Sequence, residues 1–164
     1  MLAAVALPLA GVATAHAGED LPRADAARLE SRIRELAQHP CFAMVRVMPL
    51  ATQVPTNDAR HYPVYQVCEE LGVPVAINAG IPGPRVRSRV QHPELLEDVL
   101  IDFPDLVVIV AHMGHPYEEL LMNYMRKWPN LYVSCTAYAP RYMDPALVSF
   151  MNTKWLSLSA VMGM

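Results

Sequence analysis

Three polar residues stand where apolar, β-branched runs of the chain end. Arg46 is the last polar residue of the run AMVRV, one position before its end, while Asn78 closes VPVAIN and His112 closes LVVIVAH. An imidazole can transfer a proton near neutral pH or bind a metal, and a guanidinium can hold a carboxylate through paired hydrogen bonds. His112 is therefore the candidate catalytic residue, and Arg46 and Asn78 are candidate substrate-binding residues. On spacing alone, a core histidine bonded to a backbone carbonyl explains His112 equally well.

A second group of candidates follows the run that ends at Asn78. The loop of residues 81–90, IPGPRVRSRV, concentrates Arg85, Arg87 and Arg89. Guanidinium groups in this loop would attract an anionic substrate, whereas in an ordinary solvated loop all three would point to water. We expect at most Arg85 to face a pocket and to bind substrate there.

Histidines elsewhere add one weaker candidate and no metal motif. His115, three residues after His112, can line the same pocket and bind substrate, or it can belong to the loop or to a helix cap. Three other histidines occupy positions typical of exposed residues: His39, His61 and His92. Neither HxH nor HExxH occurs, and no cluster of Cys and His is present. The sequence therefore contains no self-sufficient metal site, and it also lacks a phosphate loop and a GxSxG elbow.

The strand-end candidates require a sheet whose strands run in parallel. Apolar runs indicate strands at residues 2–7, 43–47, 73–77, 106–111 and 131–134. Amphipathic stretches indicate helices at residues 24–39, 59–71, 93–102, 116–127 and 145–150. About five strands, each followed by a helix, imply right-handed βαβ units and an α/β fold. A closed eight-stranded barrel takes ~250 residues, so this chain predicts a partial (β/α)8 TIM-type barrel or a smaller open sheet.

Composition limits the classes of partner and compartment. The net charge of −3 gives no electrostatic reason to expect nucleic acid, and no segment approaches the ~20 apolar residues of a membrane span. Three widely spaced cysteines without a CxxC pair favour reduced thiols in the cytoplasm. Residues 1–17 end in Ala-His-Ala, which is typical of a secretory signal, so secretion is the alternative. We prefer a buried strand at residues 2–7, because no Lys or Arg lies near the start.

Four segments of the chain, taken in order, form a specific combination of motifs. They are VRVMP at Val45–Pro49, the segment Asn57–Arg85 with VPVAINAG, the segment His92–Leu121 with VIVAHMG, and KWPNLYVSCTAY at Lys127–Tyr138. One of these motifs alone would be weak. Together they resemble the amidohydrolase-related family, which includes aminocarboxymuconate-semialdehyde and resorcylate decarboxylases.

The resemblance implies a (β/α) barrel that holds a catalytic divalent metal, often zinc. In the family an HxH pair of the first strand, a His of a middle strand and an Asp of the last strand bind the metal, and another strand-tip His assists the chemistry. His112 matches the assisting His, whereas Asn78 stands at the position of the middle-strand ligand. The HxH pair would lie upstream of this chain, and residues 155–164 diverge from the strand that supplies the Asp. We expect one incomplete domain over residues 1–164 that does not bind the metal itself.

For activity, the resemblance implies a hydrolase or carboxy-lyase that acts on a small carboxylate-bearing substrate, impaired or inactive without the missing ligands. His112 would donate or accept the proton, and Arg46 or Arg85 would bind the anion. The alternative from another class is a non-catalytic binding or assembly module that keeps part of the barrel without its metal centre. A fragment without function is a third alternative. Exposed strand edges of an open half-barrel favour a homo-oligomer.

Overall fold

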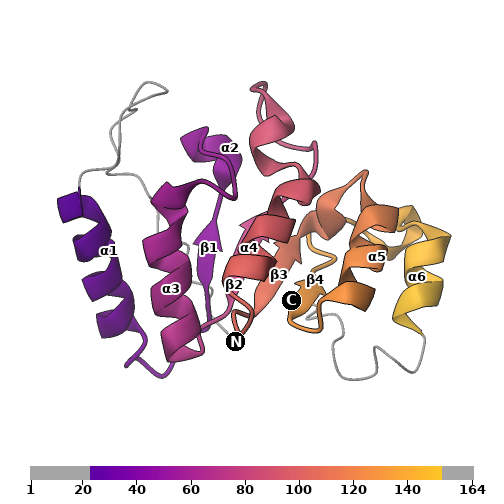
Figure 1. Ribbon diagram of the computed structural model, residues 1–164. Helices are drawn as coiled ribbons and strands as arrows, with labels where there is room; N and C mark the ends of the chain where they lie inside the picture. The colour runs from indigo at the N-terminus through magenta and orange to yellow at the C-terminus, as the bar shows by residue number, and fades with distance from the viewer. Residues whose placement is uncertain (1–22, 153–164) are drawn as a thin grey trace.

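Strands and helices alternate along residues 23–152, the part of the chain that the computed structural model describes (Figure 1). The strands are β1 (Val45–Val47), β2 (Val75–Asn78), β3 (Val108–Ala111) and β4 (Leu131–Val133). The helices are α1 (Arg23–Leu36), α2 (Pro49–Thr52), α3 (Tyr62–Leu71), α4 (Leu96–Asp102), α5 (Glu118–Lys127) and α6 (Pro145–Met151). The strand predicted at residues 2–7 and the tail at residues 155–164 lie outside the described residues.

The four strands form one parallel sheet in the order β1-β2-β3-β4. This arrangement confirms the predicted α/β class and four of the five predicted strands. Every strand differs from its predicted range: β1 and β3 begin two residues later, β4 ends one residue earlier, and β2 differs at both ends. β2 begins at Val75, because Pro74 has no N–H to donate to the ladder. β2 also extends to Asn78, which pairs with Ala111 of β3, so Asn78 is the last residue of the strand rather than the first of a loop.

Helices cover one face of the sheet, and Figure 1 shows them in front of the strands. Alternate strand residues such as Val47, Ile77 and Val110 point into the core beneath these helices. The opposite face carries a smaller cluster that includes Ala76 and Ile109. Since side chains alternate along a strand, Arg46 and Asn78 belong to this second face. The polar candidates are thus separated from the main hydrophobic core by the sheet itself.

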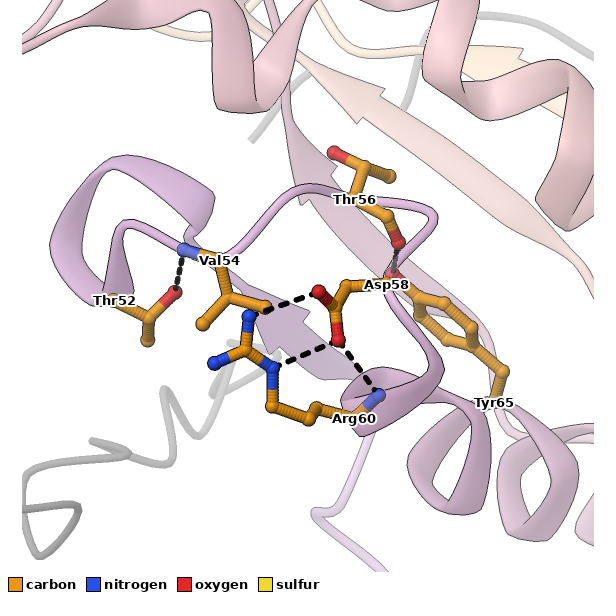
Figure 2. Close-up of polar contacts among 6 residues, drawn as sticks. All are labelled: Thr52, Val54, Thr56, Asp58, Arg60 and Tyr65. Atoms are coloured by element: carbon orange, nitrogen blue, oxygen red, sulfur yellow. Dashed lines mark hydrogen bonds and ion pairs between the residues drawn. The ribbon is translucent and has the colours of Figure 1, made fainter. Parts of the chain in front are cut away.

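The loop after α2 is held by local polar contacts (Figure 2). Arg60 donates from Nε and Nη2 to the two carboxylate oxygens of Asp58, at 2.8 Å each, and the Arg60 backbone N–H donates to the same carboxylate. These bonds lower the pKa of Asp58 to about 2. The Tyr65 hydroxyl donates to the backbone carbonyl of Thr56 at 2.8 Å. The loop is therefore tied to α3, which fixes its path above the sheet.

His61 differs from the prediction that it is exposed, since its side chain is 4% exposed. It ends a 3-10 turn before α3, and the amphipathic pattern predicted only a helix start there. The Nε2 atom has no hydrogen-bond partner among the described residues. Burial lowers the pKa of His61 to about 4, against an opposing hydrogen bond to the backbone of Val54. His61 is thus a buried, neutral histidine in the native state.

We predict that His61 makes the protein sensitive to mild acid. Because its pKa falls from an ordinary value of 6.5 to about 4 on folding, its contribution to stability is complete above pH 6.5 and is lost as the pH falls toward 4. Between about pH 7 and about pH 4.5 the wild type should lose about 2 to 3 kcal/mol more free energy of unfolding than His61→Phe. Urea unfolding at both pH values measures this difference. His39→Phe, at an exposed histidine, is the control and should keep the wild-type pH dependence.

Gly80 brings the loop after β2 against the turn after β3. Its φ is +96°, and a Cβ atom there would lie 2.2 Å from the backbone oxygen of His115. Ile81 donates its N–H to that same oxygen at 2.8 Å, and Gly80 donates to the carbonyl of Gln91 at 3.0 Å. The absence of a side chain at Gly80 therefore permits the contact between the two loops.

We predict that Gly80→Ala destabilises the fold far more than Gly72→Ala. Both glycines have positive φ, but a Cβ at Gly72 meets nothing within 4 Å. Gly72→Ala should lower the free energy of unfolding by about 1 to 2 kcal/mol through backbone strain alone. Gly80→Ala should lower it by more than about 3 kcal/mol, because backbone atoms must also move. Thermal and urea unfolding measure both values, and equal losses would contradict the close contact.

Candidate functional site

The three strand-end residues meet in one hydrogen-bonded cluster. Arg46 donates to the Asn78 Oδ1 atom from Nε at 3.1 Å and from Nη2 at 2.9 Å. The same Nη2 atom lies 3.2 Å from His112 Nε2. All three side chains are partly buried. The structure therefore brings together Arg46, Asn78 and His112, which the sequence singled out separately.

The partners of His112 define its protonation. A guanidinium can only donate, so His112 Nε2 accepts from Arg46 and carries no proton. The proton is then on Nδ1, which lies 3.1 Å from the backbone oxygen of Thr136 and 3.1 Å from its hydroxyl. We assign a neutral ring with the Nδ1–H tautomer on this basis. The lone pair of Nε2 consequently faces the cluster.

The backbone that carries His112 adopts a left-handed turn. His112, Met113 and Gly114 have φ values of 60°, 57° and 60°. Left-handed conformations are unfavourable for residues with a Cβ, so surrounding contacts must hold them. The Met113 side chain is 1% exposed, and its N–H donates to the carbonyl of Ser134 at 3.0 Å. This anchor fixes the imidazole of His112 relative to β3 and β4.

His115 lies in the same turn but has a different partner. Its Nδ1 atom is 2.6 Å from Glu118 Oε1, and its side chain is 46% exposed, whereas that of Glu118 is 9% exposed. The ring also contacts that of Tyr138, with centroids 5.3 Å apart. The His115 backbone N–H donates to the His112 carbonyl at 3.2 Å, but no hydrogen bond within residues 23–152 joins the two imidazole rings, so the structure places the His115 ring beside the cluster without linking it to the ring of His112.

Sequence reasoning missed Thr136 and Glu118. The signal for Thr136 was its position three residues after the end of β4, the strand that pairs with β3. The signal for Glu118 was its place three residues after His115, at the first position of α5. Both residues act through contacts with a histidine rather than through a motif of their own.

The arginine loop is exposed and forms an open cleft. Arg87, Ser88 and Arg89 line a space of about 490 Å³. Arg85 is exposed and is not one of the residues lining this cleft. The expectation that Arg85 binds substrate therefore stays a prediction.

The donors at the strand ends do not suit a divalent metal. Within residues 23–152, no three or more side chains of His, Cys, Asp or Glu gather closely enough to hold one. Asn78 offers a neutral amide oxygen, which binds zinc weakly. The acceptors Asn78 Oδ1 and His112 Nε2 are also both occupied by Arg46, whose positive charge opposes a cation at the same place. The cluster is instead suited to an anion and to proton transfer at His112.

In the described part of the chain, no helix has the length and apolar character to cross a membrane.

Comparison with known proteins identifies the family. The amidohydrolase family model matches residues 15–155, which is most of the chain. No curated protein gives a significant match. An uncharacterised TIM-barrel protein of Bordetella bronchiseptica is 32% identical in sequence, with a TM-score of 0.59. That match covers 71% of this chain and 41% of the Bordetella protein.

Two decarboxylases have similar structures at lower sequence identity. The 5-carboxyvanillate decarboxylase of Sphingomonas paucimobilis is 14% identical, with a TM-score of 0.53, over 77% of this chain and 48% of that one. The 2,6-dihydroxybenzoate decarboxylase of Rhizobium is 16% identical, with a TM-score of 0.52, over 80% of this chain and 54% of that one. These two matches show the fold alone, and the chain spans about half the length of each. Given the match of the family model over residues 15–155 and the parallel sheet of a partial TIM barrel, the chain belongs to the amidohydrolase family.

Proposed function

We propose that the cluster of Arg46, Asn78 and His112 binds the carboxylate of a small molecule and serves a hydrolase or carboxy-lyase reaction. The observation that carries the proposal is the position of Arg46, whose guanidinium bonds both Asn78 Oδ1 and His112 Nε2. The Nε atom of Arg46 donates to Asn78 Oδ1, and its Nη1 atom has no partner among the described residues. A carboxylate bound at the Nη1 and Nη2 edge would form the paired hydrogen bonds that guanidinium favours.

Binding at that edge would also activate His112. A carboxylate that takes Nη2 releases His112 Nε2 from its bond to Arg46 and leaves the lone pair beside the substrate. Nε2 can then accept a proton from water in a hydrolysis. In a decarboxylation the carbon that loses carbon dioxide keeps the electron pair of the broken bond and takes a proton, which His112 can supply from Nε2 once that atom has taken a proton from solvent. The contact of Nδ1 with Thr136 keeps the ring oriented during either transfer.

The names of the structural neighbours agree with a carboxylate substrate. Two of them are decarboxylases of aromatic acids, 5-carboxyvanillate and 2,6-dihydroxybenzoate. The family resemblance adds a divalent metal to such chemistry, but the donor set at the strand ends does not fit one. We therefore propose an anion site centred on Arg46, with no step through a metal.

A non-catalytic binding module is the second candidate function. The occupation of both possible ligand atoms by Arg46 favours it, because the cluster then retains anion binding without the metal chemistry of the family. The two candidates differ at His112. A catalyst needs its imidazole for turnover, whereas a binding module needs only the guanidinium and would bind ligand equally well with Gln at that position.

We predict that Arg46→Gln weakens binding of 2,6-dihydroxybenzoate by about 10- to 100-fold, the loss expected for one charge-assisted contact. Calorimetric titration of the purified chain measures the affinity. Arg126→Gln is the matched control, because Arg126 contacts Asn123 and Phe150 at the far end of α5. Unchanged affinity in Arg46→Gln would contradict the proposed anion site.

For the reaction itself, His112→Gln should reduce release of carbon dioxide or hydrolysis product by about 10²- to 10⁴-fold while binding persists. Mass spectrometry of the ligand after incubation measures turnover in both proteins. Binding without turnover in the wild type would favour the non-catalytic module. Equal turnover in wild type and His112→Gln would exclude His112 as the acid or base.

We predict that the dialysed chain retains no stoichiometric zinc. A neutral amide and one imidazole, both bonded to a guanidinium, supply too few free donors to hold the ion. Elemental analysis of the wild type and of His112→Ala measures the metal content. Stoichiometric zinc that disappears in His112→Ala would show that other side chains complete a metal site, and would overturn the metal-independent proposal.

A further inference from the structure

We propose that the cleft lined by Arg87, Ser88 and Arg89 is a second anion-binding site, which takes the phosphate or carboxylate group of a small molecule. The cleft has a volume of about 490 Å³, and its lining residues do not include Arg46, Asn78 or His112. It therefore stands apart from the cluster at the strand ends, and its occupation does not depend on the function proposed for that cluster.

The surroundings of the cleft carry one sign of charge. Residues 71–93 contain Arg85, Arg87 and Arg89 but no Asp or Glu, although the whole chain has a net charge of −3. The 3-10 turn Ser88–Gln91, which contributes Ser88 and Arg89 to the lining, packs against α2. Residues 47–57, which include α2, contain no charged residue. Positive charge is thus concentrated beside the cleft without nearby carboxylates in these segments to neutralise it.

The guanidinium groups of the loop differ from three others in the described chain, which are paired with carboxylates. Arg32, Arg34 and Arg60 each form an ion pair with a carboxylate. Within residues 23–152, no ion pair or hydrogen bond involves the side chain of Arg87 or Arg89. Their donors are consequently free to bind a ligand, which need not first displace an internal carboxylate.

The base of the loop is anchored, so the arginines are held near one another. Gly80 and Gln91 are joined by two hydrogen bonds, from Gly80 N–H to the Gln91 carbonyl at 3.0 Å and from Gln91 Nε2 to the Gly80 carbonyl at 2.9 Å. Thr56 donates its N–H to the Val90 carbonyl at 3.0 Å. A fixed loop loses less conformational entropy when it binds a ligand.

The chemistry of the lining defines the ligand. Two guanidinium groups and the Ser88 hydroxyl provide donors for the oxygens of a phosphate or carboxylate. Two exposed apolar side chains occur in the same loop, Ile81 at 51% and Val86 at 46%. The loop thus offers apolar surface for the body of an organic anion as well as charge for its head.

Titration of the full chain with inorganic phosphate, followed by two-dimensional NMR at constant ionic strength, tests the proposal. We expect saturable shifts at residues 85–91, and at least about 10-fold weaker binding when Arg87 and Arg89 are both replaced by Gln. Arg126→Gln should bind phosphate as the wild type does, and the shifts at residues 85–91 separate this site from any anion bound at the strand-end cluster. Acetate in place of phosphate reports whether the site accepts carboxylates as well, and saturation by either anion at these residues supports the proposal.

Three results would overturn it. One is the absence of saturable shifts with either anion. The second is binding that Arg46→Gln abolishes and the Arg87→Gln, Arg89→Gln double variant retains, because the anion would then occupy the strand-end cluster. The third is a loss of equal size in Arg126→Gln, which would indicate general attraction to surface charge. Unchanged melting temperatures of the Arg87→Gln, Arg89→Gln double variant and of Arg126→Gln confirm that these exposed substitutions leave the fold intact.

Discussion

The parallel register of β1, β2 and β3 is the constraint on which the site depends. Arg46 of β1 pairs with Ala76 of β2, and Asn78 of β2 pairs with Ala111 of β3. The carboxyl ends of the three strands therefore lie side by side at one edge of the sheet. Asn78 and His112, which follow Arg46 by 32 and 66 positions in sequence, can therefore share its guanidinium. A shift of one residue in any strand would turn its side chains to the opposite face and separate the cluster.

The register also explains why one face of the sheet carries the polar candidate residues while the other face packs into the hydrophobic core. The helices bury the Val, Ile and Leu side chains of the first face in the main core. The second face keeps only a small apolar cluster and admits Arg46 and Asn78 at its carboxyl edge. Stability and binding are thus assigned to different sets of side chains on the same short strands, so a change in one set need not disturb the other.

The sequence predicted the class of fold and the three members of the cluster because both follow from where apolar runs begin and end. It could not predict which polar side chains would meet, since Arg46 and His112 are far apart in the chain. His61 was misjudged because a helix-start position does not reveal that the preceding loop folds over it. Thr136 and Glu118 were missed because their roles depend on the path of the turn after β3. Loop geometry, rather than periodicity, decides all of these contacts.

The hydrogen bonds of Arg46 to Asn78 and to His112 have an evolutionary consequence. Replacing Asn78 with a histidine would bring a potential metal ligand into contact with a guanidinium that excludes the metal. Replacing Arg46 first would leave Asn78 Oδ1 and His112 Nε2 without their shared donor. Each single step toward a metal-binding relative is therefore unfavourable unless the other has already occurred. Divergence between arginine-centred and metal-centred members of this fold is expected to require coupled substitutions, so intermediate sequences should be rare.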